Sequence, residues 1–404
     1  MKKSTIVIVA AALLISASMG TRQTFGLFID PFSSDRGISL PVIAFAMALH
    51  NLIWGLAQPF AGAAADRYGA MPVAIMGSFA FAAGLALAAV APSGVLLVIG
   101  LGVLVGIGVS CTTFGVVLTA VGRAAAPEKR SMAMGLASAG GSLGPVALVP
   151  LAQAITETWG LSASLVVLAL VVAAVAPFGL LLDRRDPGAA PAEELRAPPL
   201  SEMLLLAIHH PGYRLLTIGF FTCGFQLAFI ATYLPGYLLL CQMPAGLGAT
   251  ALALIGLFNM VGTWACGWLG GRIRQQYVLA WLYLVRAVTI GAFVALPKSG
   301  LLVIAFAAIM GLTWLGTVPL TSGWIAKVFG TRHLGTLFGI CFLSHQIGSF
   351  LGAWSGGVVF DLTGSYTLVW GLTAVAGLLA AAVNMPIKDG PALNLAPAAA
   401  RMPS

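Results

Sequence analysis

Long apolar stretches dominate this sequence, and short polar segments interrupt them at fairly regular intervals. A membrane-spanning helix needs about 20 mostly apolar residues, and twelve stretches of the chain meet that condition. Their approximate limits are 6–31, 40–62, 71–90, 94–121, 131–156, 162–182, 213–239, 247–270, 277–296, 301–327, 334–359 and 367–385. The pattern therefore predicts an all-α membrane protein with twelve transmembrane helices.

The first apolar stretch allows a second interpretation. The segment MKKSTIVIVAAALLISASMG has the basic start, apolar centre and small-residue end of a cleavable signal peptide. The apolar run continues past Gly20, however, and its removal would leave eleven spans. We therefore interpret this segment as the first transmembrane helix.

The largest polar interruption divides the twelve spans into two sets of six. Residues 183–212 begin with DRRDPGAAPAEELRAPPLSEM, a composition typical of a linker. We predict an N-terminal six-helix bundle at 1–182, a cytoplasmic linker at 183–212, a C-terminal six-helix bundle at 213–387 and a disordered cytoplasmic tail at 388–404. The segment LSEMLLLAIHHPGYR predicts a short amphipathic helix that Pro211 separates from the seventh span.

Composition and charge agree with a membrane protein. Hydrophobic residues make up 59% and charged residues 8% of the chain, whereas about a quarter of a soluble domain is charged. With the N-terminus in the cytoplasm, sixteen of the twenty Lys and Arg residues lie on the cytoplasmic side. The net charge of +8 is thus a sign of orientation and does not indicate nucleic-acid binding. We expect a multi-pass protein of the bacterial inner membrane with both termini in the cytoplasm.

Two motifs recur in the two halves of the chain. GAAADRYG follows the second span, and GWLGGRIR follows the eighth at an offset of 205 residues, without the aspartate. RSMAMGLASAGGSLGP in the fifth span has its counterpart in RHLGTLFGICFLSHQIGSFLG of the eleventh, at an offset of 204. Such repeats are typical of a transporter built from two related six-helix halves.

On these motifs the chain resembles the major facilitator superfamily over nearly its whole length. The resemblance implies two pseudo-symmetric six-helix bundles that rock about a central site. It also implies a cytoplasmic gate, in which the loop motif pairs with charges or helix ends of the other half; the gating residues are Gly62, Asp66, Arg67, Gly69, Gly267 and Arg272. Residues 311–357 are similar to bacterial members near the monocarboxylate porter and oxalate/formate exchanger group.

Two arginines lie within spans, whereas all twelve acidic residues lie at span ends, in the linker or in the tail. A charge at the bilayer centre costs roughly 2.5 to 3.5 kcal/mol on insertion scales. We hypothesise that an anionic substrate supplies the missing counter-charge and that Arg22 binds it, because a guanidinium offers two parallel donors to a carboxylate. The alternative is that Arg22 extends to the outer lipid headgroups. For Arg286 in the ninth span, which is peripheral in the superfamily, bonding to helix-end carbonyls or a place near the cytoplasmic surface is preferred.

Polar and aromatic residues at helical spacing complete the candidate site. The substrate-binding candidates are Arg22, Phe25, His50, Asn51, Trp54, Gln226, Tyr233, Trp314, Thr317, His345 and Gln346, with Arg286 as a second charge. Hydrogen bonding between helices is the alternative role for each of them. His50 and His345 are also candidates for proton coupling, since histidine titrates near neutrality. Exchange of one anion for another would need no protonatable residue.

These features predict a secondary active transporter of a small organic anion, preferably a monocarboxylate, that works by proton symport or anion exchange. An exporter of hydrophobic or drug-like compounds is the alternative, although such a cavity usually contains an acid. A non-transporting sensor is expected to carry a sizeable soluble domain or long tail. The five cysteines show no disulfide or metal-ligand spacing, and no catalytic pair is evident, so we expect neither a cofactor nor an enzyme. We expect a monomer.

Overall fold

A computed structural model describes residues 3–183, 198–390 and 392 of the chain. In these residues eleven helices are long and apolar enough to cross a membrane. One of them, Pro127–Leu181, has 55 residues and reverses at Gly160, whose φ of +84° favours glycine. This segment therefore makes two passes, and the prediction of twelve spans is confirmed.

The N-terminal bundle contains several spans that are assembled from more than one helical piece. The first span tightens from an α-helix to a 3-10 helix and back, and the fourth passes through a π-helical segment. The elements are α1 (Lys3–Gln23), η1 (Thr24–Phe28), α2 (Ile29–Ser34), α3 (Leu40–Tyr68), α4 (Ala70–Val90), α5 (Gly94–Leu97), η2 (Val98–Leu104), α6 (Val105–Thr112), α7 (Phe114–Ala124), η3 (Pro127–Lys129), α8 (Arg130–Gly141), α9 (Leu143–Val175) and η4 (Ala176–Leu181).

The C-terminal bundle follows a short helix, α11 (Leu200–His209), which coincides with the predicted amphipathic segment. Pro211 begins the next helix, as expected for proline at a first helical position. The tenth span is broken between residues 313 and 317. The elements are α12 (Pro211–Leu240), α13 (Ala245–Gly270), α14 (Gln275–Ala295), α15 (Gly300–Thr313), α16 (Thr317–Phe329), α17 (Leu334–Thr363) and α18 (Thr367–Asn384).

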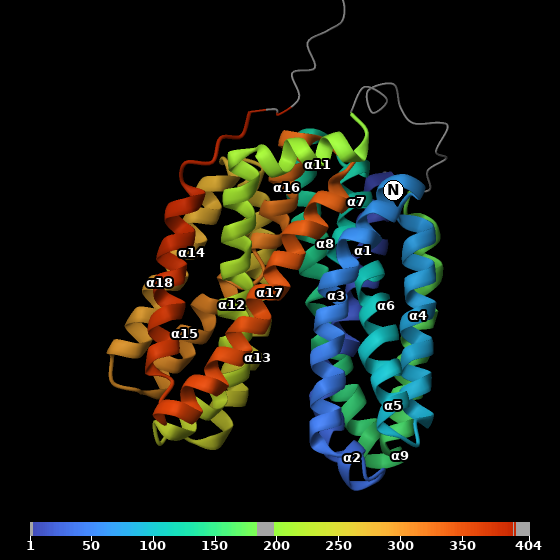
Figure 1. The fold of residues 1–404 in the computed structure, drawn as a ribbon, viewed down its shortest axis with the longest axis vertical. Helices are drawn as coiled ribbons and strands as arrows, with labels where there is room; N and C mark the ends of the chain where they lie inside the picture. The colour runs from blue at the N-terminus through green and yellow to red at the C-terminus, as the bar shows by residue number, and fades with distance from the viewer. Residues whose placement is uncertain (1–2, 184–197, 391, 393–404) are drawn as a thin grey trace, which may run out of the picture.

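The two bundles stand side by side, approach each other at one end and diverge toward the other (Figure 1). The N-terminus and α11 lie at the end where the bundles approach, which we call the linker end. Residues 184–197 of the predicted linker and residues 391 and 393–404 of the predicted tail lie outside the described residues.

Two helix pairs join the bundles, and we call them the α3/α17 seam and the α8/α13 seam. On the first, a Cβ atom added to Gly62 would overlap the carbonyl group of Gly335. On the second, a Cβ atom added to Gly267 would lie 2.6 Å from the Cα atom of Gly135. Small residues allow helix backbones in a membrane to approach closely. Because Gly62 and Gly267 are the repeated glycines, the two seams are related by the internal repeat.

Hydrogen bonds between the bundles reach about halfway along these helices. Gln346 Nε2 donates to the backbone oxygen of Asn51 at 3.0 Å, and Asn259 Nδ2 donates to Ser142 Oγ at 3.0 Å. No hydrogen bond between described residues joins the bundles farther from the linker end than these two. The described molecule is therefore closed at the linker end.

Two cations at the opposite end stabilise helix termini. Arg36 donates to the carbonyl oxygens of Ala89 and Ala91 at the end of α4, with a distance of 2.8 Å to Ala91. Lys298 Nζ donates to the carbonyl oxygen of Leu296 at 2.9 Å, just beyond the end of α14. A cation at a helix C-terminus satisfies free carbonyls and complements the helix dipole. These two residues, which lie between the predicted spans, thus have a structural role.

The close contact of Gly62 with Gly335 predicts that the methyl group of an alanine at position 62 forces the helices of the α3/α17 seam apart. In Gly62→Ala, the new Cβ atom must displace the backbone of Gly335, so we expect faster amide exchange in residues 334–338 by hydrogen–deuterium exchange mass spectrometry. Alanine is about 1 kcal/mol more favourable than glycine in a helix, so helix propensity would act in the opposite direction. Gly371→Ala is the matched control, because a Cβ atom there meets nothing within 4 Å. Equal exchange in both variants would contradict the prediction.

Candidate substrate site and linker-end contact

Arg22 lies in the last turn of α1, where the span tightens into η1. Its Nη2 atom donates to Asn51 Oδ1 at 2.9 Å, and its Cζ atom lies 5.1 Å from the centroid of the Trp54 ring. The Nε atom is buried without a hydrogen-bond partner. No carboxylate of the described residues forms an ion pair with Arg22. A neutral amide and an aromatic face therefore hold this charge, and donor capacity remains.

Aromatic side chains surround Arg22 on its own bundle. The His50 ring makes edge contacts with Phe25 and Trp54, with centroid distances of 5.5 and 6.4 Å. Trp54 Nε1 donates to Gln58 Oε1 at 3.0 Å, which fixes the orientation of the indole. The His50 Nε2 atom is buried and has no hydrogen-bond partner. Together with the bonds of Arg22, these contacts bring five predicted site residues on α1, η1 and α3 into one group.

The C-terminal bundle completes this group through α17. Trp54 lies 4.8 Å from Phe342 by ring centroids, and His345 stacks on Phe342 at 5.4 Å. His345 Nδ1 lies 3.2 Å from Gln346 Oε1, and the same glutamine donates to the backbone of Asn51. We call this group the central cluster; it comprises Arg22, Phe25, His50, Asn51, Trp54, Phe342, His345 and Gln346.

Arg286 is fully buried and belongs to a second polar group. Its guanidinium donates to the carbonyl oxygens of Thr313 and, at 2.7 Å, of Trp314, where α15 ends. It also reaches Gln226 Oε1 at 3.5 Å and Cys223 Sγ at 3.4 Å on α12. Arg286 thus caps a broken helix, which is the helix-end role that the sequence favoured for it.

Three further candidates have structural partners outside the central cluster. Gln226 Nε2 donates to the carbonyl oxygen of Thr373 at 3.1 Å, so its amide links α12 to α18. Thr317 Oγ1 lies 3.3 Å from Cys223 Sγ. The Tyr233 hydroxyl donates to the carbonyl oxygen of Ala353. These residues, together with Trp314 beside Arg286, have no described hydrogen bond with the central cluster.

Asp66 forms the polar contact that closes the linker end. Its carboxylate accepts hydrogen bonds from the backbone N–H groups of Gly335 at 3.0 Å and Thr336 at 2.7 Å, and from the Thr336 hydroxyl at 2.7 Å. These groups belong to the first turn of α17, where free N–H groups and the helix dipole favour an anion. Arg123 Nη2 donates to the same carboxylate at 2.9 Å and Nη1 to Asp183 at 2.8 Å.

The other members of the loop motif surround this contact. Gly69, with φ of +86°, makes the turn between α3 and α4. Arg67 is exposed and lies over the Tyr68 ring, with Cζ 5.2 Å from the centroid. In the second copy, Arg272 stacks on Trp268 at 3.8 Å, and Gly271 occupies the position that corresponds to Asp66. The α8/α13 seam therefore has no carboxylate at this position.

The sequence analysis did not identify several residues that form these contacts. For four of them the internal repeat contains a recognisable pattern, because a cation and an acid recur at nearly the same offset. Arg123 and Lys327 are 204 residues apart, and Asp183 and Asp389 are 206 apart. In each half the cation and the acid form an ion pair with each other: Arg123 with Asp183 in the N-terminal half, and Lys327 with Asp389 in the C-terminal half. The hydrogen bond from Lys327 holds the pKa of Asp389 below its usual value. Phe342, an apolar residue on a hydrophobic helix, gave no such signal.

The fold of two pseudo-symmetric six-helix bundles, joined by paired motifs, defines a membrane transporter. The family model of the Major Facilitator Superfamily matches residues 11–353, so the chain belongs to this superfamily. Among solved structures, the Escherichia coli fucose:proton symporter FucP has a TM-score of 0.71 at 17% identity, over 94% of this chain and 98% of that one.

Similar proteins include transporters of carboxylates. The chain is 26% identical to the MFS-type transporter YcxA of Bacillus subtilis, over 91% of each chain. It is 24% identical to the oxalate:formate antiporter of Oxalobacter formigenes, over 93% of this chain and 89% of that one. Monocarboxylate transporter 13 of Rattus norvegicus is 25% identical, over 90% of this chain and 83% of the other.

The buried ion pair at the linker end predicts a strong coupling between Asp66 and Arg123. Removing one partner of a buried pair costs about 3 to 5 kcal/mol, so Asp66→Asn and Arg123→Gln should each lower the thermal unfolding midpoint. The double variant should lose much less than the sum. The control is Lys327→Gln with Asp389→Asn in the other half, because Lys327 is half-exposed and surface pairs contribute about 0 to 1 kcal/mol. Additive effects of Asp66→Asn and Arg123→Gln would contradict the coupling.

Proposed function

We propose that this transporter carries a small organic anion, preferably a monocarboxylate, and that Arg22 binds its carboxylate. The observation that carries the proposal is the difference between Arg22 and the other cations away from the linker end. Arg36, Lys298 and Arg286 each donate to the terminal carbonyls of a helix. Arg22 instead donates to one side-chain amide and to no backbone carbonyl of the described residues; its buried Nε, like that of Arg286, has no partner.

The surroundings of Arg22 suit a short carboxylate. Asn51 holds the guanidinium on one side and Trp54 lies against it, so the remaining donors are fixed in direction. A guanidinium binds a carboxylate through two parallel N–H donors. Phe25, His50 and Trp54 provide an aromatic wall for the body of such a molecule. The names of two relatives, an oxalate:formate antiporter and a monocarboxylate transporter, support the same class of substrate.

The contacts between the bundles support a route for this anion. We place the linker end in the cytoplasm, since most Lys and Arg residues are at this end. The described state is closed on that side, so the substrate would reach Arg22 from outside. Release would require separation of Asp66 from the first turn of α17. The protein would then lie in the bacterial inner membrane as a monomer, with bundles at 1–182 and 213–387 and the linker at 183–212.

Transport by purified protein in liposomes tests the substrate and the anchor. We expect uptake of lactate, pyruvate, formate or oxalate. In Arg22→Gln, kcat/KM should fall roughly 10- to 100-fold, because a hydrogen bond to a charged group contributes about 1.5 to 3 kcal/mol. Arg22→Lys should keep part of the activity, since it retains the charge but loses the two-pronged geometry.

Lys298→Gln is the control for removal of a cation that caps a helix. It should change thermal stability more than substrate affinity. Uptake of neutral or cationic solutes without uptake of anions would refute the proposed class of substrate. Wild-type rates in both Arg22 variants, once they are inserted and folded, would refute the role of Arg22.

Proton symport and anion exchange remain the two coupling modes of the proposal, and an imposed gradient separates them. Symport predicts accumulation driven by a pH gradient into empty liposomes, whereas exchange predicts uptake only when an anion is enclosed. If a histidine carries the proton, His50→Gln or His345→Gln should abolish gradient-driven accumulation and leave counterflow intact. Unchanged accumulation in both variants would exclude the histidines and leave the substrate carboxyl as the proton carrier.

A further inference from the structure

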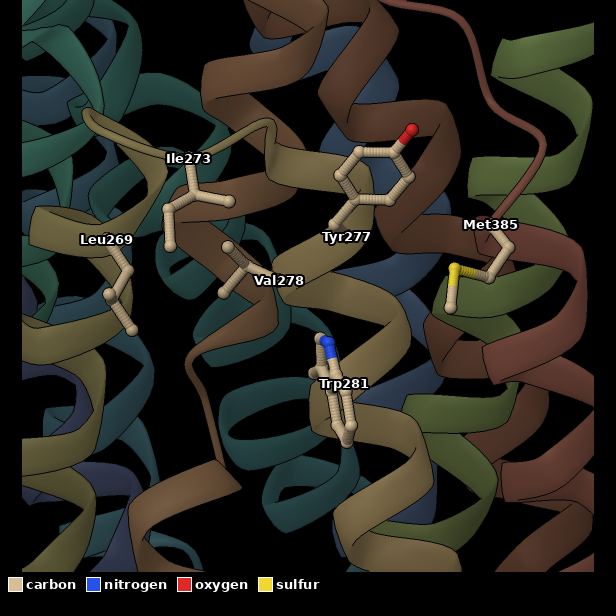
Figure 2. A pocket seen from close by; sticks show the side chains of 6 residues that line it. All are labelled: Leu269, Ile273, Tyr277, Val278, Trp281 and Met385. Carbon is tan, nitrogen blue, oxygen red and sulfur yellow. The ribbon is translucent and has the colours of Figure 1, made fainter.

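A groove lies on the outer surface of the C-terminal bundle at the linker end. It has a volume of about 470 Å³, within the roughly 300 to 1,000 Å³ of ligand pockets. It is formed by the end of α13, the connection to α14, the first turns of α14 and the residue that follows α18 (Figure 2). Its lining residues are Leu269, Ile273, Tyr277, Val278, Trp281 and Met385.

The lining of this groove is apolar apart from the Tyr277 hydroxyl and the Trp281 indole N–H (Figure 2). Trp281, Met385 and Ile273 are about half exposed or more. Tryptophan and tyrosine are enriched where hydrocarbon meets lipid headgroups. The groove begins at the first turn of α14 and so lies at that boundary. Its chemistry therefore matches a hydrocarbon chain that ends beside a polar group.

Cations border the polar end of the groove. Arg272 and Arg274, both exposed, flank the lining residue Ile273 in the chain. Lys388, also exposed, follows the lining residue Met385 by three positions. The nearby carboxylate of Asp389 is already bonded to Lys327 and lies 4.0 Å from Arg274 Nε. Asp389 thus has two cations as partners, and the exposed Arg272 and Lys388 add further positive charge at this end of the groove.

We propose that this groove binds one acyl chain of an anionic phospholipid, whose phosphate is held by Arg272 and Arg274. Basic pockets at the ends of transmembrane helices bind anionic lipid headgroups, and each Lys or Arg near the surface adds to the attraction. The Arg272 guanidinium is held by its stacking on Trp268, one residue before the lining residue Leu269. It is the repeat counterpart of Arg67, but Gly271 replaces the aspartate, so the second motif copy is available for a ligand. The proposal does not depend on the transported substrate.

Native mass spectrometry of the delipidated full-length protein tests this site. Phosphatidylglycerol and phosphatidylcholine with the same acyl chains are titrated separately, and the ratio of their binding constants is measured. We expect wild type to prefer phosphatidylglycerol by about tenfold or more. Arg272→Gln/Arg274→Gln should reduce this ratio to near one, and Arg272→Lys/Arg274→Lys should restore most of it. Met385→Trp, which fills the groove, should weaken the binding of both lipids.

A matched control removes two exposed cations elsewhere at the linker end. Arg67→Gln/Arg214→Gln changes the net charge by the same amount and should keep the preference of the wild type. An equal loss of preference in the control would show that overall charge attracts the lipid and would overturn the proposal. So would an unchanged ratio in Arg272→Gln/Arg274→Gln, or unchanged binding of both lipids in Met385→Trp.

Discussion

A permanent positive charge within a membrane must be held by other groups, and this requirement organises much of the structure. Arg286 meets it with the free carbonyls of a helix end, and Arg36 and Lys298 bind helix-end carbonyls in the same way outside the spans. The tenth span is broken where Arg286 binds it. Arg22 meets the requirement only in part, because an amide and an indole face are weaker partners than a row of carbonyl groups.

Much of the fold could be predicted from the sequence because its signals are local. The length of each apolar stretch is enough to predict a span. The chain reverses at Gly160, a glycine, which is the residue type that most easily adopts the positive φ found there. The repeated glycines of the loop motif also lie where the bundles touch, since close approach of two backbones leaves room for no other residue. Asp66 was identified, but its contact with α17 joins positions about 270 residues apart, which spacing cannot reveal.

The candidate site was predicted less completely, for a physical reason. Helical spacing shows which residues share a face but not which neighbour that face meets. Gln226 and Tyr233 share a face of α12, yet they bond to the carbonyls of α18 and α17. The sequence distinguished Arg22 from Arg286 only through the family resemblance, whereas the structure distinguishes them by the partners of each guanidinium. Phe342, central to the aromatic contacts, is one of many apolar residues in its helix.

Both seams contain glycines at which the helix backbones approach closely, but only the α3/α17 seam has a carboxylate at the position of Asp66. On the α3/α17 seam a carboxylate binds a helix terminus, whereas on the α8/α13 seam Gly271 leaves only close backbone packing near the linker end. The dispersion energy of a contact falls sharply when the atoms move apart by a fraction of an ångström, whereas the attraction between a charge and a helix end persists over several ångströms. The bundles would therefore part unevenly, with one side free early and the other still attracted. Separation at the linker end therefore has to break a charged contact on the α3/α17 seam, where Asp66 binds both Arg123 and the first turn of α17.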